Sequence, residues 1–192
     1  MALTILPQHA NRVRLYPVEP RHAAMFCFAL LTASCALASL AFACATPFAA
    51  FAVVAAATLP LRPALLVVTG AWLVNQGIGF GALHYPVDAR TFAWGFVIGA
   101  AALVSTATAS AVLRALPQGR APLMLAVALV AAYAAHELAL FAATPFLGGA
   151  GAFTPTIVAR IGLTSALWFA GLVAVCEIIR LLAPFGRGRA TA

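Results

Sequence analysis

The chain has 192 residues, of which 65% are hydrophobic and 8% are charged, and its mean hydropathy is +1.05. A soluble domain carries about 25% charged residues, so this composition excludes a soluble globular fold and predicts an integral membrane protein. The net charge of +7 does not indicate nucleic-acid binding, because every basic residue is an arginine and the arginines lie at the ends of apolar stretches.

The order of apolar and polar segments predicts an all-α transmembrane domain over residues 23–183. A cytoplasmic leader (1–22) precedes it and a basic cytoplasmic tail (184–192) follows it. The first apolar run is too long for a signal-peptide core of about 7–15 residues, so we interpret it as a retained span. Six transmembrane helices are expected at residues 23–43, 48–60, 64–78, 90–116, 123–143 and 155–183.

Proline and glycine set the expected boundaries of these helices. Thr46-Pro47 separates the first two spans, and the second span is short for a hydrocarbon core of about 30 Å, so tilt or local bilayer thinning should accommodate it. The alternate glycines at positions 77, 79 and 81 should end the third helix, and Thr144-Pro145 should end the fifth.

Arginine distribution predicts the orientation of these spans. With six alternating helices, one side holds nine arginines, at positions 12, 14, 21, 62, 114, 120, 180, 187 and 189, and the other side holds only Arg90 and Arg160. Cytoplasmic loops retain positive charge, so both termini are expected in the cytoplasm. A five-span arrangement would scatter the arginines across both faces.

Polar side chains gather in the half of the bundle away from the termini. An ionisable group at membrane depth costs about 2.5–3.5 kcal/mol on insertion scales, so such groups normally face a bundle interior or a watery cavity. We therefore expect an outward-opening pocket formed by Asn75, Gln76, His84, Tyr85, Asp88, His136, Glu137 and Arg160.

Structural roles for the same residues remain open. Asn75 and Gln76 are equally suited to bond neighbouring helices, Glu137 and Arg160 to form an ion pair, and His136 to bond another helix. The segment around His84 and Tyr85 has the composition of an interfacial turn.

Catalytic and metal-binding motifs are lacking. His136-Glu137 begins like a zinc-protease helix, but Leu140 stands where the second histidine is needed. The four cysteines form no CxxC pair, and we interpret them as small apolar helix residues. No enzymatic activity is predicted.

One motif carries a family resemblance. The run Asn75-Gln76-x-x-Gly79-Phe80-x-x-Leu83-x-Tyr85-Pro86-x-Asp88-x-x-Thr91-x-x-Trp94-Gly95, with the six-helix topology, resembles the substrate-binding S-components of energy-coupling-factor (ECF) transporters. The solitary cobalamin-binding type, the BtuM-like proteins, is the most similar. The resemblance covers about a tenth of the chain in sequence and the rest in topology alone.

The resemblance implies capture of cobalamin (vitamin B12) or a related corrinoid as substrate at a bacterial inner membrane, with no cofactor of its own. Phe80, Leu83 and Trp94 then join the residues expected to contact substrate. Docking on a transmembrane coupling protein with ATPases is implied for the face carrying Ala29 and Ala33.

The motif departs from the cobalamin type because it contains no cysteine, which argues against thiolate-assisted removal of cyanide from the cobalt. His84 is then the expected axial cobalt ligand, since neutral imidazole suits such metals, and Cys44 is the reserve. Two alternative functions remain: an S-component for another vitamin or a metal ion, and a non-transporting membrane assembly factor.

Overall fold

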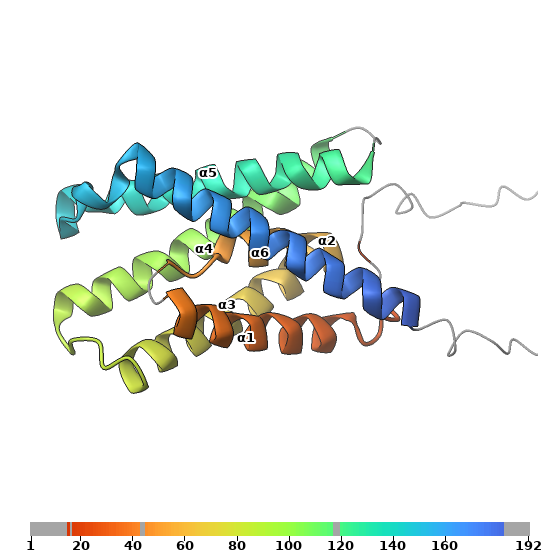
Figure 1. The fold of residues 1–192 in the computed structure, drawn as a ribbon, viewed down its shortest axis with the longest axis horizontal. Coiled ribbons are helices and arrows are strands. Elements are labelled where there is room, and N and C mark those ends of the chain that lie inside the picture. Colours follow the sequence, from red (N-terminus) through yellow and green to blue (C-terminus); the bar gives the residue numbers. More distant parts are fainter. Residues whose placement is uncertain (1–14, 16, 43–44, 117–119, 183–192) are drawn as a thin grey trace, which may run out of the picture.

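The computed structural model describes residues 15, 17–42, 45–116 and 120–182, and this part of the chain is helical without any β-strand (Figure 1). The predicted tail lies outside the described residues, and residues 15 and 17–22 are the described part of the predicted leader. The helices are α1 (Ala23–Phe42), α2 (Phe48–Thr58), α3 (Leu61–Gly81), α4 (Ala89–Ala115), α5 (Ala121–Leu147) and α6 (Pro155–Leu182), with a short 3₁₀ turn, η2 (Ala150–Phe153), before α6.

Five of these helices are long and apolar enough to cross a membrane, and α2 is the exception. The prediction of an all-helical, multi-pass membrane protein is confirmed at that level. At about 1.5 Å per residue, the eleven residues of α2 reach about 16 Å, roughly half of a hydrocarbon core.

The short helix α2 is enclosed by the other helices. Ten of its eleven residues are buried, and it packs against α1, α3, α4, α5 and α6. A helix that is apolar on all sides belongs in the interior of a bundle, and the small alanine side chains of α2 allow close approach of the surrounding helices. Enclosure by protein therefore allows a helix of this length within the bundle, and the expected tilt or bilayer thinning stays a prediction.

Successive helices run in alternating directions, so the start of α1 and the end of α6 lie at the same end of the bundle (Figure 1). The backbone N–H of Leu15 donates to the carbonyl oxygen of Ala57 (2.9 Å), which joins the segment before α1 to the end of α2 at that end. The helix ends located there carry Arg21, Arg62, Arg114, Arg120 and Arg180. We call it the arginine-rich end.

The glycine segment of α3 corrects one prediction, because the helix continues through Gly77 and Gly79 to Gly81. An isolated glycine costs a helix only about 1 kcal/mol, so it does not by itself end one. At Gly79 the missing side chain makes room for the ring of Tyr85, since a Cβ atom there would lie 2.7 Å from Tyr85 Cε2. The chain turns only at His84, whose φ is +53°.

Helix α5 also passes its expected end and continues through Pro145 to Leu147. Proline removes the N–H that would bond the carbonyl four residues earlier, on Phe141. The hydroxyl of Thr144 donates to that carbonyl instead (2.8 Å). The helix stops at Gly148, which has a φ of +75° that favours glycine.

Candidate functional site

A cavity of about 500 Å³ lies at the end of the bundle opposite the arginine-rich end. The beginnings of α2, α4 and α6, the second half of α5, the turn η2 and the segment before α4 supply its walls. This is the end at which the sequence places its polar side chains. The lining residues are Ala45, Thr46, Phe48, Ala49, Tyr85, Pro86, Thr91, Trp94, Ile98, Tyr133, His136, Glu137, Leu140, Gly149, Ala152, Phe153, Ile157, Ile161 and Ser165.

Four of the predicted substrate-contacting residues line this cavity: Tyr85, Trp94, His136 and Glu137. The other predicted residues lie outside its lining: Asn75, Gln76, Phe80, Leu83, His84, Asp88 and Arg160. The structure thus brings together residues of α4, α5 and the segment between α3 and α4. Most residues of the 75–95 motif lie outside the cavity lining.

His136 is the most buried ionisable residue of the cavity wall. Its exposed fraction is 7%, and its Nδ1 atom has no hydrogen-bond partner. Its ring centroid lies 6.2 Å from that of Phe48. A buried polar atom without a partner costs about 1–3 kcal/mol, a cost that a bound ligand or metal ion would remove. This nitrogen is therefore the strongest indication of a binding site.

Glu137 adds a half-buried carboxyl group to the same wall. The proposed ion pair with Arg160 is not formed: in the described part of the chain, the ion pairs within 4.0 Å join Arg21 to Glu19 and Arg180 to Glu177. The Tyr133 hydroxyl, one turn before Glu137, lies close enough to interact with its carboxyl group. That hydroxyl donates to the Val158 carbonyl oxygen (2.6 Å) and so connects α5 with α6.

Asn75 forms hydrogen bonds to neighbouring segments, as expected if its role is structural. Its Nδ2 donates to Ser39 Oγ on α1 (2.8 Å) and to Thr46 Oγ1 before α2 (3.0 Å), and its Oδ1 accepts from Gln76 Nε2 (3.0 Å). Because Thr46 lines the cavity, Asn75 supports the wall from behind.

Aromatic packing orders the segment between α3 and α4. Phe80 stacks on Phe92, with ring centroids 4.7 Å apart, and meets Tyr85 edge to face at 6.3 Å. Leu83, which is close to these aromatic residues in the sequence, is half-buried, whereas His84 is exposed. The expected cobalt ligand His84 is thus separate from the cavity lining.

Asp88 has a structural role as the N-cap of α4. Its carboxylate accepts a hydrogen bond from the backbone N–H of Thr91 (2.8 Å), and this bond lowers the pKa of Asp88. The side chain is exposed and is directed to its own helix rather than to the cavity.

Metal binding by a cluster of side chains is not indicated, because the described residues contain no group of three or more His, Cys, Asp or Glu residues that could hold an ion. Cys27, Cys35 and Cys176 are buried free cysteines in helices, as predicted. The reserve ligand Cys44 lies outside the described residues.

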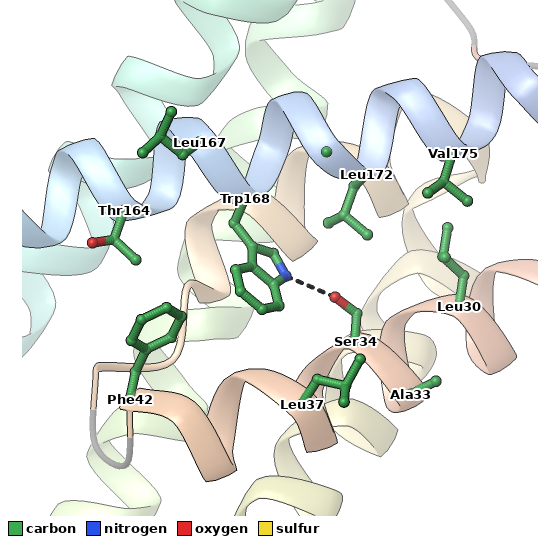
Figure 2. Close-up of a pocket in the computed structure, with 11 residues that line it drawn as sticks. Leu30, Ala33, Ser34, Leu37, Phe42, Thr164, Leu167, Trp168, Leu172 and Val175 are labelled. Atoms are coloured by element: carbon green, nitrogen blue, oxygen red, sulfur yellow. Dashed lines mark hydrogen bonds between the residues drawn. The ribbon is translucent and has the colours of Figure 1, made fainter.

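A second hollow lies between α1 and α6 and was not predicted (Figure 2). This groove has a volume of about 640 Å³. Its one bond across the helices runs from Trp168 Nε1 to Ser34 Oγ (2.7 Å). Ala33 lines it, and Ala29 is exposed one turn earlier on α1. Its other lining residues are Leu30, Leu37, Phe42, Thr164, Leu167, Gly171, Leu172 and Val175.

Sequence reasoning also missed Phe48 and Tyr133 as cavity residues. Tyr133 had a detectable pattern, because it precedes Glu137 by four residues and side chains at that spacing share a helix face. Phe48 had none, since an aromatic residue at the start of an apolar helix is equally suited to lipid. No protein-family model, curated protein or solved structure matches this chain.

Proposed function

We propose that this protein is a membrane-embedded ligand-capture protein of the S-component type, with both termini in the cytoplasm of a bacterial cell and its cavity open to the other side of the inner membrane. The arginine-rich end supports this orientation, because positive charge is retained on the cytoplasmic side. The cavity, at the opposite end, is then accessible from outside the cell.

The ligand we propose is cobalamin or a related corrinoid, taken up through this cavity. The resemblance of the 75–95 motif implies this substrate class. The unpartnered Nδ1 of His136 is the observation that supports the cavity as the binding site. Imidazole is a suitable ligand for cobalt. We therefore assign the axial-ligand role to His136 in place of His84. A corrinoid is larger than the cavity, so part of it would remain at the mouth.

A spectrum of the bound corrinoid tests this assignment. Wild-type protein purified in non-ionic detergent from cells given cobalamin should be coloured, and His136→Ala should shift its absorption bands or abolish binding. His84→Ala is the matched control and should leave the spectrum unchanged. A wild-type protein that is colourless and gives no heat on titration with cobalamin would overturn the proposed ligand. A shift in His84→Ala alone would return the role to His84.

A smaller vitamin is the second candidate, and the cavity volume favours it. About 500 Å³ lies within the range of roughly 300–1,000 Å³ that encloses drug-sized ligands. Growth rescue separates the candidates: expression of the protein in strains that each require one vitamin should restore growth at a limiting concentration of the true ligand only.

Transport would require a coupling partner with ATPases, and Ala29 and Ala33 remain the proposed docking face because both are exposed on α1. The assembly-factor alternative predicts a different result. It explains Asn75 as a bond between helices and predicts co-purification with a large partner but no small ligand.

A further inference from the structure

We propose that the cavity discriminates between ligands by charge: it accepts a group with a positively charged nitrogen and rejects carboxylates, with Glu137 as the counter-ion. This inference rests on the proposed function only in that the cavity takes up a small molecule. It does not depend on the identity of that molecule as a corrinoid.

The first argument is the carboxyl group itself. Glu137 is half-buried in the wall of an otherwise largely apolar cavity, and within the described residues no arginine, lysine or histidine lies within 4.0 Å of it. A carboxylate in such surroundings is stabilised by an opposite charge within about 4–6 Å. A cationic ligand supplies that charge, and an anionic ligand would repel it.

The second argument is that the arginines at this end of the bundle lie elsewhere. Arg160 is exposed and does not line the cavity. Arg90 is also exposed, and its guanidinium group packs against the last turn of α5, where a Cβ atom on Gly148 would lie 2.9 Å from its Nη2. A cation near the carboxyl end of a helix is favourable there. Neither arginine occupies the place that a ligand cation would take.

The third argument is the aromatic lining. Phe48, Tyr85, Trp94, Tyr133 and Phe153 reach the cavity from five different segments. The faces of aromatic rings attract cations, and several rings around one volume form the kind of cage that binds substituted ammonium groups. An apolar ligand would need the rings but not Glu137, whereas an organic cation uses both.

His136 provides a further polar atom for the same ligand. It precedes Glu137 directly, and its buried Nδ1 is without a partner on the protein. Together, one carboxyl group, one imidazole nitrogen and five rings define a site for an aromatic or aliphatic amine rather than for an acid.

A matched pair of probes tests the charge preference. Phenylpropylamine and phenylbutyrate share a phenyl ring and its linker but carry opposite charges. We expect calorimetric titration of the wild-type protein in non-ionic detergent to give a dissociation constant about tenfold lower for the amine. Glu137→Gln should remove most of the preference and leave the smaller part that the aromatic rings contribute. Glu177→Gln, which removes the exposed carboxylate paired with Arg180 near the arginine-rich end, is the control and should retain it.

The inference is overturned if the carboxylate binds as tightly as the amine, if neither probe binds, or if Glu137→Gln keeps the full preference. The wild-type comparison needs no variant, so it decides even if Glu137→Gln does not fold. Titration of the same preparation with cobalamin separates the two proposals. An amine preference without cobalamin binding would end the corrinoid proposal alone, and cobalamin binding without the preference would end this one alone.

Discussion

The cavity near His136 and the groove between α1 and α6 have similar volumes, about 500 and 640 Å³, but different walls. Five helical segments and a loop enclose the cavity and place Glu137 and His136 on it. Only two helices form the groove, and its walls are mostly hydrocarbon, with the Ser34–Trp168 bond and the Thr164 hydroxyl as the exceptions (Figure 2).

This difference follows from the surroundings of each hollow: protein encloses the cavity, whereas the groove faces lipid. Polar atoms at membrane depth are costly unless protein or trapped water surrounds them, so they collect where several helices enclose a volume. A groove on the lipid-facing side can be filled by acyl chains and needs no polar atoms. Depth and enclosure, rather than size, therefore separate a candidate ligand site from a lipid-facing groove.

The largest expected effect is on the free energy of unfolding, and it tests whether the cavity wall is also part of the hydrophobic core. Phe48 is 1% exposed, whereas Leu167 on the groove is 66% exposed. Phe48→Ala should lower the free energy of unfolding by about 3 kcal/mol because it leaves a void that neighbouring helices cannot fill. Leu167→Ala should change it by less than about 0.5 kcal/mol, since lipid or detergent replaces the lost contacts. Unfolding in mixed detergent measures both, and equal losses would break the distinction.

A middle-sized effect is expected for the polar bond across the groove. Ser34→Ala removes the acceptor of the Trp168 indole N–H and should cost about 1 kcal/mol. Thr32→Ala is the matched control on the same helix, because its hydroxyl donates to carbonyl oxygens of α1 itself, those of Phe28 (2.7 Å) and Ala29 (3.3 Å). In thermal unfolding in detergent, Ser34→Ala should have a lower melting temperature than Thr32→Ala. The reverse order would mean that the groove is not held by this bond.

The smallest effect concerns the N-cap of α4 at the cavity end. The Thr91 N–H lowers the pKa of Asp88 in the folded protein, so the ionised cap contributes stability above its unfolded pKa of about 3.9. That contribution is lost as the pH falls through the folded pKa. Wild type should therefore melt at a higher temperature than Asp88→Ala at neutral pH, and the gap should shrink in acid. A gap independent of pH would contradict the capping role.

Much of the architecture was predictable from sequence, because apolar length and arginine position act locally. The predicted ends of α1 and α6 differ from the observed ends by one residue, and the short length of α2 was visible in Thr46-Pro47 and Pro60. The errors at Gly81 and Pro145 have one cause. The effect of a glycine or proline on a helix depends on its neighbours in space: Tyr85 fills the space at Gly79, and the Thr144 hydroxyl compensates for the missing N–H of Pro145.

The candidate site was harder to predict for a different reason. Depth in the membrane follows from position along a helix, so the sequence placed His136 and Glu137 at the correct end. The direction of a side chain depends on the rotation of its helix against several others. Sequence therefore could not show that His136 lines the cavity, that His84 lies outside its lining, or that Asn75 supports Thr46 from behind.

By itself, the sequence determined that the helices of this protein suit a membrane, the number and order of those helices, and the end at which its polar groups gather. Composition and the spacing of prolines and arginines set these properties one segment at a time. Only the tertiary structure decided that α2 is enclosed, that Glu137 and His136 share a wall with five aromatic rings, and that a groove remains between α1 and α6. These features depend on which faces of distant segments meet, and packing of the whole bundle sets those contacts.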